Sequence, residues 1–356
     1  AIEALGKIRD TRAVEPLIAT LRDKKSGARK KAAEALEKID SEWYRSNTAK
    51  MQIPEFIKAL RDEDSDIRYS VAEVLGNIGD VRAVEPMIAA LRDKDMYVRK
   101  NVATSIEKID SEWHRSDFAK TQAPEFITAL RDDDSYIRKD ATEVLGKIGD
   151  PRAIEPMIGL LKDCNSDVQK GAAESLGKIG KPSVVPLLAV LRDSYASIRE
   201  IIVKILVEIG TPAVDLLITT LEDKNSSVRK SIVIALGNIR DVSAVEQLVA
   251  VLRDDNSDVR GATSEALVKI DSDWHRSNAA KRQIPEFIAA LRDKNSDIRT
   301  IAGEILEKFE PKWYRSDAAK MQIPDFITAL SDKDYEVRWQ AAEMLGKLDW
   351  TPITDV

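Results

Sequence analysis

The sequence has little of what most catalytic and membrane-bound proteins depend on. Its 356 residues include one cysteine, Cys164, which excludes an internal disulfide and a multi-cysteine metal site. Aromatic residues (Phe, Trp and Tyr) make up only 5% of the chain. No run of about 18 apolar residues predicts a transmembrane helix, and no charged-then-apolar leader predicts a signal peptide. These absences favour a cytoplasmic protein without membrane insertion.

Chemical motifs are missing as well. The chain has no Gly-rich phosphate loop, no nucleophile elbow, no metal-ligand spacing and no Cys/His nucleophile pair. The formal net charge of −6 gives no electrostatic footprint for nucleic acid. We therefore predict a protein that is not an enzyme, needs no cofactor or metal, and does not bind nucleic acid.

What the sequence does have is a repeat. Aligned on one aspartate, the copies follow one another after 30, 31 or 39 residues, and nine of the ten carry an arginine six residues later. Such a period is typical of stacked units that bury their apolar faces against their neighbours. We predict a structural ladder made of Asp23, Arg29, Asp62, Arg68, Asp93, Arg99, Asp132, Arg138, Asp193, Arg199, Asp223, Arg229, Asp254, Arg260, Asp293, Arg299, Asp332 and Arg338. In the fifth copy Gln169 replaces the arginine that would follow Asp163, which predicts a seam there.

Each copy predicts a pair of helices. In the first copy Ala13, Leu17 and Leu21 form an apolar stripe on a first helix, and Leu36 faces inward from a second helix. Ser26 is predicted to cap that second helix, because its hydroxyl can accept a free N–H of the first turn. The same role is predicted for Ser65, Ser135, Ser166, Ser226, Ser257 and Ser296.

The stretch 83–93 (AVEPMIAALRD), followed by Val98-Arg99, resembles HEAT repeats, as does 146–150 (GKIGD). The closest subtype is the HEAT-like repeat named after phycobilisome lyases. The resemblance implies an all-α fold, an α-α superhelix in which about ten helical hairpins form one right-handed solenoid over residues 1–356. Residues 1–9 resemble the end of a preceding repeat and 349–356 the start of a further one, so we expect a fragment of a longer chain.

Four copies carry about eight extra residues, which accounts for the spacing of 39. Each insert contains a tryptophan: Trp43, Trp113, Trp274 and Trp313. The second helix before each insert lacks its usual glycine, and Glu37, Glu107, Val268 and Glu307 stand there instead. We expect these helices to run on and each tryptophan to pack the longer connection onto the solenoid; the alternative is a repeated partner-binding edge. His114 and His275 follow two of the tryptophans where the other copies have tyrosine, which indicates an aromatic rather than a catalytic role.

The resemblance places the second helices on the concave surface, where charged residues predominate. Apolar or aromatic departures from that pattern are candidate binding anchors. The candidates are Ile201, Lys204, Ile234, Tyr69, Trp339 and Gln340, with a second row in the turns at Tyr97, Tyr136, Tyr195 and Tyr335. The alternative for Ile201 and Ile234 is that they fill a tighter groove. We predict a scaffold or assembly subunit that binds protein partners, and the resemblance adds a bilin lyase or isomerase subunit as the alternative.

Overall fold

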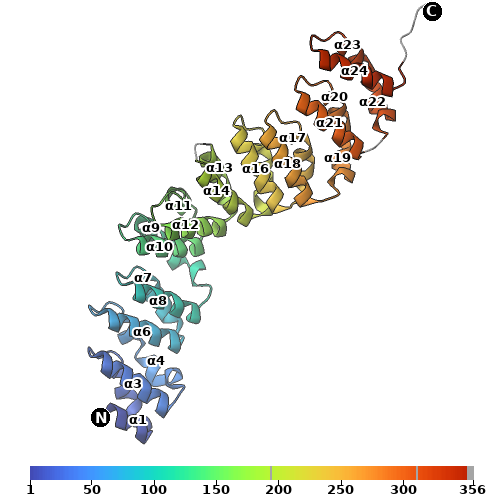
Figure 1. The fold of residues 1–356 in the computed structure, drawn as a ribbon. Helices are drawn as coiled ribbons and strands as arrows, with labels where there is room; N and C mark the ends of the chain where they lie inside the picture. The colour runs from blue at the N-terminus through green and yellow to red at the C-terminus, as the bar shows by residue number, and fades with distance from the viewer. Residues whose placement is uncertain (193–194, 310–311, 351–356) are drawn as a thin grey trace, which may run out of the picture. The chain divides into compact units, whose positions relative to one another are not determined.

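The computed structural model describes residues 1–192, 195–309 and 312–350. Helices and turns account for these ranges, and no strand occurs in them. The chain divides into two compact units, Ala1–Ile179 and Gly180–Val356, which are described separately below. Each is an array of helical hairpins (Figure 1). The predicted all-α class of stacked hairpins, an α-α superhelix, is therefore confirmed.

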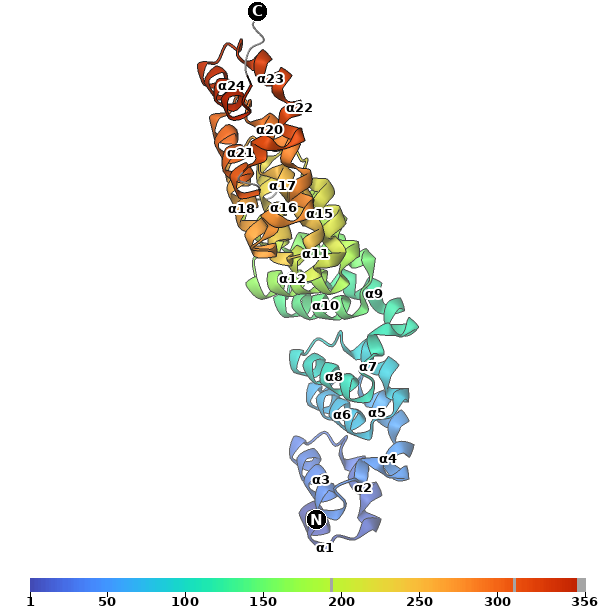
Figure 2. The same cartoon turned by 90° about the vertical axis from the view of Figure 1, so that its right-hand side faces the viewer.

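The first unit alternates a short first helix with a longer second helix, and the two kinds of helix form two layers (Figure 2). Its helices are α1 (Ile2–Ile8), α2 (Val14–Thr20), α3 (Ser26–Ile39), α4 (Asn47–Met51), α5 (Ile53–Ala59), α6 (Ser65–Ile78), α7 (Val84–Ala90), α8 (Met96–Ile109), α9 (Asp117–Ala129), α10 (Ser135–Ile148), α11 (Ile154–Leu160) and α12 (Ser166–Ile179). Gln169 lies in α12, the last helix of this unit.

The second unit repeats the same alternation. Its helices are α13 (Val184–Leu191), α14 (Ala196–Ile209), α15 (Val214–Thr220), α16 (Ser226–Ile239), α17 (Val245–Val251), α18 (Ser257–Ile270), α19 (Asn278–Arg282), α20 (Ile284–Ala290), α21 (Ser296–Phe309), α22 (Asp317–Met321), α23 (Ile323–Ala329) and α24 (Tyr335–Lys347). One-turn 3₁₀ helices introduce the first helices of both units, at Thr11–Ala13, Trp43–Arg45, Val81–Ala83, Trp113–Arg115, Pro151–Ala153, Lys181–Ser183, Thr211–Ala213, Val242–Ala244, Trp274–Arg276 and Trp313–Arg315.

The second helices are capped one residue earlier than predicted. Ser65 is the first helical residue of α6, and the side chain of Asp64 before it accepts a hydrogen bond from the backbone N–H of Asp66. Ser26 likewise lies inside α3, but Lys25 at the cap position of that helix makes no side-chain cap hydrogen bond. The aspartate or asparagine takes the cap because its longer side chain reaches the first-turn N–H from an extended backbone. The other such caps are Asp95, Asp134, Asn225, Asn256 and Asp334.

The apolar core of each hairpin lies between its first and second helices. Leu17 and Ile18 of α2 and Leu36 of α3 are at most 1% exposed. Full burial of side chains of this size contributes roughly 2 kcal/mol each. The stripe predicted from the sequence is therefore the face that the hairpin buries.

We term a spacing of 30 or 31 residues between aligned aspartates a short step and a spacing of 39 a long step. The second helices before long steps do not run on, contrary to our expectation. Helix α3, before a long step, has 14 residues, as does α6 before a short step. The extra residues instead form the tryptophan turn and a short helix such as α4, which Ser46 caps. In the second insert the short helix is continuous with the first helix, as α9.

Candidate binding surface

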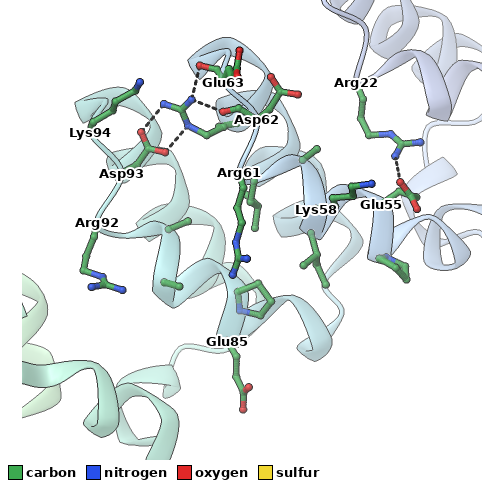
Figure 3. A pocket seen from close by; sticks show the side chains of 18 of the residues that line it. Arg22, Glu55, Lys58, Arg61, Asp62, Glu63, Glu85, Arg92, Asp93 and Lys94 are labelled. Atoms are coloured by element: carbon green, nitrogen blue, oxygen red, sulfur yellow. Dashed lines mark hydrogen bonds and ion pairs between the residues drawn. The ribbon is translucent and has the colours of Figure 1, made fainter. Parts of the chain in front are cut away.

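The Asp–Arg ladder begins within a single turn. The carboxylate of Asp62 accepts the backbone N–H of Asp64, which closes the interhelix turn. Arg68 donates from Nη1 to the carbonyl oxygens of Asp62 (2.7 Å) and Glu63 (3.0 Å), so it fastens α6 to the turn before it. Figure 3 shows Asp62, Glu63 and Asp93 around this guanidinium group. In this part of the ladder the arginine binds backbone carbonyls and not the carboxylate of its own turn.

Across short steps the arginine also holds the next repeat. Nε and Nη2 of Arg68 donate hydrogen bonds to the two carboxylate oxygens of Asp93 at 2.5 and 2.8 Å. Both side chains are less than a tenth exposed. Arg138 with Asp163 and Arg229 with Asp254 repeat this two-bond contact. The hydrogen bond to Asp163 raises the pKa of Arg138, and the same bond lowers the pKa of Asp163. Three of the five short steps thus carry largely buried, bidentate ion pairs.

Gln169 keeps half of this arrangement. Its amide Nε2 donates to the carbonyl of Asp163 at 2.7 Å, as an arginine Nη1 does elsewhere. Asp163 still has a cationic partner, because Arg138 of the preceding repeat supplies it. Asp193, the next ladder position, lies outside the described residues, and Arg199 lies in α14.

Across long steps the ladder changes partner. Arg29 does not pair with Asp62; it contacts Asp66 of α6 at 3.5 Å, and Asp66 is 71% exposed. The same shift to a carboxylate on the next second helix occurs in Arg99 with Asp140, Arg260 with Asp297 and Arg299 with Glu336. The turn aspartates Asp132, Asp293 and Asp332 still close their own turns, and Arg338 binds the Asp332 carbonyl. The ladder is therefore not uniform along the chain.

A second contact, which the sequence reasoning missed, joins the repeats across every long step. Arg22 lies 5.5 Å from the centre of the buried Phe56 ring and hydrogen-bonds Glu55 (3.1 Å) and Gln52 (3.3 Å). We name this contact the Arg–Phe brace. It recurs as Arg92 on Phe126, Arg253 on Phe287 and Arg292 on Phe326. The arginine just before each aligned aspartate was visible in the sequence, but its aromatic partner stands more than 30 residues later.

Glycines set how closely neighbouring second helices approach. A Cβ atom on Gly76 would lie 2.7 Å from Cβ of Ser105, and one on Gly146 would lie 2.6 Å from Oγ of Ser175. Helices α6 and α8, and α10 and α12, therefore lie side by side across short steps. At long steps Glu37 and Glu107 occupy the glycine position, and α3 meets α6 at few points. The missing glycine marks a wider helix spacing and not a longer helix.

Two of these long steps hold grooves open to solvent on the second-helix side. The groove between α3 and α6, here groove A, has a volume of about 540 Å³ and is lined by Glu37, Trp43 and Tyr69 among others. The groove between α21 and α24, here groove B, has a volume of about 420 Å³ and is lined by Trp339 and Gln340. Tyr69 and Trp339 are 41% and 56% exposed and occupy the same position in their helices.

The other candidate anchors are spread out. Tyr97, Tyr136, Tyr195 and Tyr335 are exposed at the starts of α8, α10, α14 and α24, and none of them lines groove A or B. Ile201 and Ile234 are half-buried on the neighbouring helices α14 and α16, and Lys204 is exposed. The structure thus brings together only part of the predicted set.

The four insert tryptophans are buried. Trp43, Trp113, Trp274 and Trp313 are between 2% and 6% exposed. Each meets the next aromatic ring edge to face at about 6 Å, whether that ring is tyrosine, as in Tyr44, or histidine, as in His114. Their rings therefore pack into the fold, and only a small part of each ring is exposed.

A wider hollow of the first unit lies on the other side, among the first helices, and has a volume of about 1390 Å³ (Figure 3). Its charged residues alternate in sign: Lys58, Arg61 and Lys94 share it with Glu63 and Glu85. Such a mixture selects no single ligand charge. Among the described residues no group of three His, Cys, Asp or Glu side chains is placed to hold a metal ion, and none of the described helices has the length and apolarity to cross a membrane.

Comparisons with known proteins agree on the fold. A family model described as HEAT repeats matches residues 1–46, 53–116, 123–193, 184–268 and 284–353. No curated protein matches the chain. Similar solved structures include an engineered protein (21% identity over 95% of this chain and 99% of that one, TM-score 0.40). Another is importin beta, with 16% identity over 95% of this chain and 51% of that one and a TM-score of 0.43. A third is Kap95p, studied with RanGDP, with 13% identity over 96% of this chain and 51% of that one and a TM-score of 0.44. The chain spans about half the length of these last two, and these likenesses concern the fold alone.

Proposed function

We propose that this chain, which belongs to the HEAT-repeat family, is a non-catalytic scaffold that binds other proteins along its second helices. One observation carries the proposal: Tyr69 and Trp339, at equivalent helix positions, each expose an aromatic ring on the wall of a long-step groove. Partly exposed aromatic side chains beside a groove are the usual anchors of protein interfaces.

The shape of the grooves favours a protein partner over a small molecule. Sites for small ligands bury most of the ligand surface in a concave pocket. Grooves A and B are instead open, are walled by two helices, and recur along the chain.

Photo-crosslinking in the native extract tests this function. A benzophenone amino acid replaces Tyr69 or Trp339, and a control replaces Val185, which is at least as exposed but lies on the first helix α13. We expect discrete crosslinked polypeptides from positions 69 and 339 and none from 185. Equal crosslinking at all three positions, or substrate turnover by the purified chain, would contradict the proposal.

The narrower alternative, a bilin lyase or isomerase subunit, rests on the repeat subtype alone and on no contact in the structure. It predicts that the purified protein binds a bilin and acquires a visible absorption band. Without that band the alternative fails, while the crosslinking test is unaffected.

A further inference from the structure

In the long step between α8 and α10, the ammonium group of a lysine is held by two other side chains of the same protein. Lys147 of α10 places Nζ 2.6 Å from Oε1 of Glu107 and 6.0 Å from the centre of the Trp113 ring. Trp113 Nε1 donates to the same carboxylate oxygen at 3.0 Å. Burial alone raises the pKa of Glu107, but the bonds from Lys147 and Trp113 outweigh it and lower that pKa. The three side chains form an ammonium site between two repeats.

Groove A has the same site without its lysine. Glu37 and Trp43 stand 70 residues before Glu107 and Trp113, but the residue 70 before Lys147 is Asn77, which is too short to take its place. Glu37, Trp43 and Asn77 all line the groove. We propose that groove A binds a lysine side chain from a basic, extended segment of a partner protein, with the ammonium group between Glu37 and Trp43.

Unpaired groups in groove A fit that occupant. The Trp43 side chain is 4% exposed, and neither its Nε1 nor the exposed Glu37 carboxylate makes a hydrogen bond or ion pair among the described residues. In the α8–α10 step the equivalent donor and carboxylate bind each other, and that carboxylate also binds Lys147. A bound ammonium draws the Glu37 carboxylate inward, as Lys147 holds Glu107.

The surrounding charges favour a basic segment and not a single neutral residue. Glu34 and Glu73 also line groove A and have no ion-pair partner in the described part of the chain. Arg29 is already paired with Asp66, which leaves Lys30 as the one other cation in the lining. Three free carboxylates against one lysine give the groove a negative field that attracts cationic side chains.

The α8–α10 step shows that this charge balance is particular to groove A. There Lys139 stands where groove A has Tyr69, and Thr104 stands where it has Glu34. Groove A therefore has no counterpart of Lys139 or Lys147, and it has one additional glutamate, Glu34. Tyr69 supplies an exposed ring over which a second cation can lie.

The remaining long steps do not offer the same site. Before α21 the carboxylate position holds Val268, so no anion is available there. Before α24, Glu307 and Trp313 stand at the equivalent positions, and Trp313 Nε1 is buried without a hydrogen-bond partner, but neither residue lines groove B. Groove B therefore carries the aromatic anchor Trp339 without an open ammonium site.

This inference rests on the proposed function and is tested apart from it, by fluorescence anisotropy with a defined probe. The probe is a fluorescein-labelled peptide in which lysine alternates with serine, and its matched control has every lysine acetylated. We expect the wild-type chain to bind the lysine peptide and to bind the acetylated one at least about tenfold more weakly, because acetylation removes the charge.

Two substitutions locate the binding. Asn77→Lys recreates the internal lysine of the α8–α10 step and should weaken peptide binding at least about tenfold, as should Glu37→Gln. The matched control is Asn238→Lys, at the same helix position in α16 across a short step. Asn238 accepts a hydrogen bond from Lys269 (3.2 Å), just as Asn77 accepts one from Lys108 (3.5 Å). This control adds the same charge and should leave binding within about twofold.

A gain of function completes the test. Lys147→Asn combined with Lys139→Tyr and Thr104→Glu gives the α8–α10 step the residues of groove A and should raise the stoichiometry from one peptide to two. Circular dichroism melting of every variant checks that the fold is retained. Absence of peptide binding to the wild type, or equal weakening by Asn77→Lys and Asn238→Lys, overturns the lysine site. The scaffold function would still be tested independently by the crosslinks from positions 69 and 339.

Discussion

Arg68 and Asp93 form a buried ion pair that joins two repeats, with Nε–Oδ2 and Nη2–Oδ1 distances of 2.5 and 2.8 Å. The equivalent Arg29 faces a long step and contacts the exposed Asp66 at 3.5 Å. The eight additional residues therefore exchange a strong link for a weak one on the second-helix side. On the first-helix side, the Arg–Phe brace provides a further contact between the two repeats of a long step.

Arg68→Gln should destabilise the first unit by about 3 kcal/mol. Glutamine can still donate to the Asp62 carbonyl, as Gln169 does to Asp163, but it leaves the Asp93 carboxylate buried without a cation. Arg29→Gln is the control and should cost about 1 kcal/mol or less, because Asp66 is solvated. Urea denaturation monitored by circular dichroism measures both. Equal losses would show that the short-step pair is not stronger.

Stability should fall in acid partly through Asp163. The hydrogen bond from Arg138 lowers its pKa below the ordinary 3.8. A carboxyl with a lowered folded pKa contributes fully above its unfolded pKa, and the contribution is lost as the pH falls through the folded value. The melting temperature of Asp163→Asn should therefore be lower than that of wild type at neutral pH and depend less on pH below about 4. Parallel acid profiles for the two proteins would refute this.

The repeat, the apolar stripes and the hairpins were predictable because each depends on residues close in sequence. Three features were not. The capping role of Asp64 depends on where the helix begins, and sequence patterns place helix ends only to within a few residues. The loss of glycine at Glu37 was noticed, but its consequence lies across the repeat boundary. The pairing of Arg22 with Phe56 also needs the distance between two hairpins, which one sequence does not contain.

Gly146 should not tolerate a methyl group. A Cβ there would lie 2.9 Å from Cα of Ser175, so α10 and α12 must move apart. We expect Gly146→Ala to cost about 1–2 kcal/mol, since overpacking exceeds the gain in helix propensity. Gly261→Ala in α18 is the matched control, because nothing lies within 4 Å of its Cβ, and it should stabilise by up to about 1 kcal/mol. Thermal melts that show the same sign for both would refute the close-packing argument.

The Arg–Phe brace should appear as a coupling energy between Arg22 and Phe56. The guanidinium lies 5.5 Å from a fully buried ring, and its Nε has no hydrogen-bond partner among the described residues, as expected if the ring face takes that place. Phe56→Leu keeps an apolar side chain, and Arg22→Met keeps most of the apolar stem.

A double-mutant cycle with these two substitutions should give a coupling of about 1 kcal/mol, which salt weakens only slightly because the site is partly desolvated. Arg22→Met combined with Phe126→Leu, in the next brace along the chain, is the control and should be additive within about 0.5 kcal/mol. If the first cycle is additive as well, the long steps are held by apolar packing alone. The repeated arginine before each insert would then need another explanation.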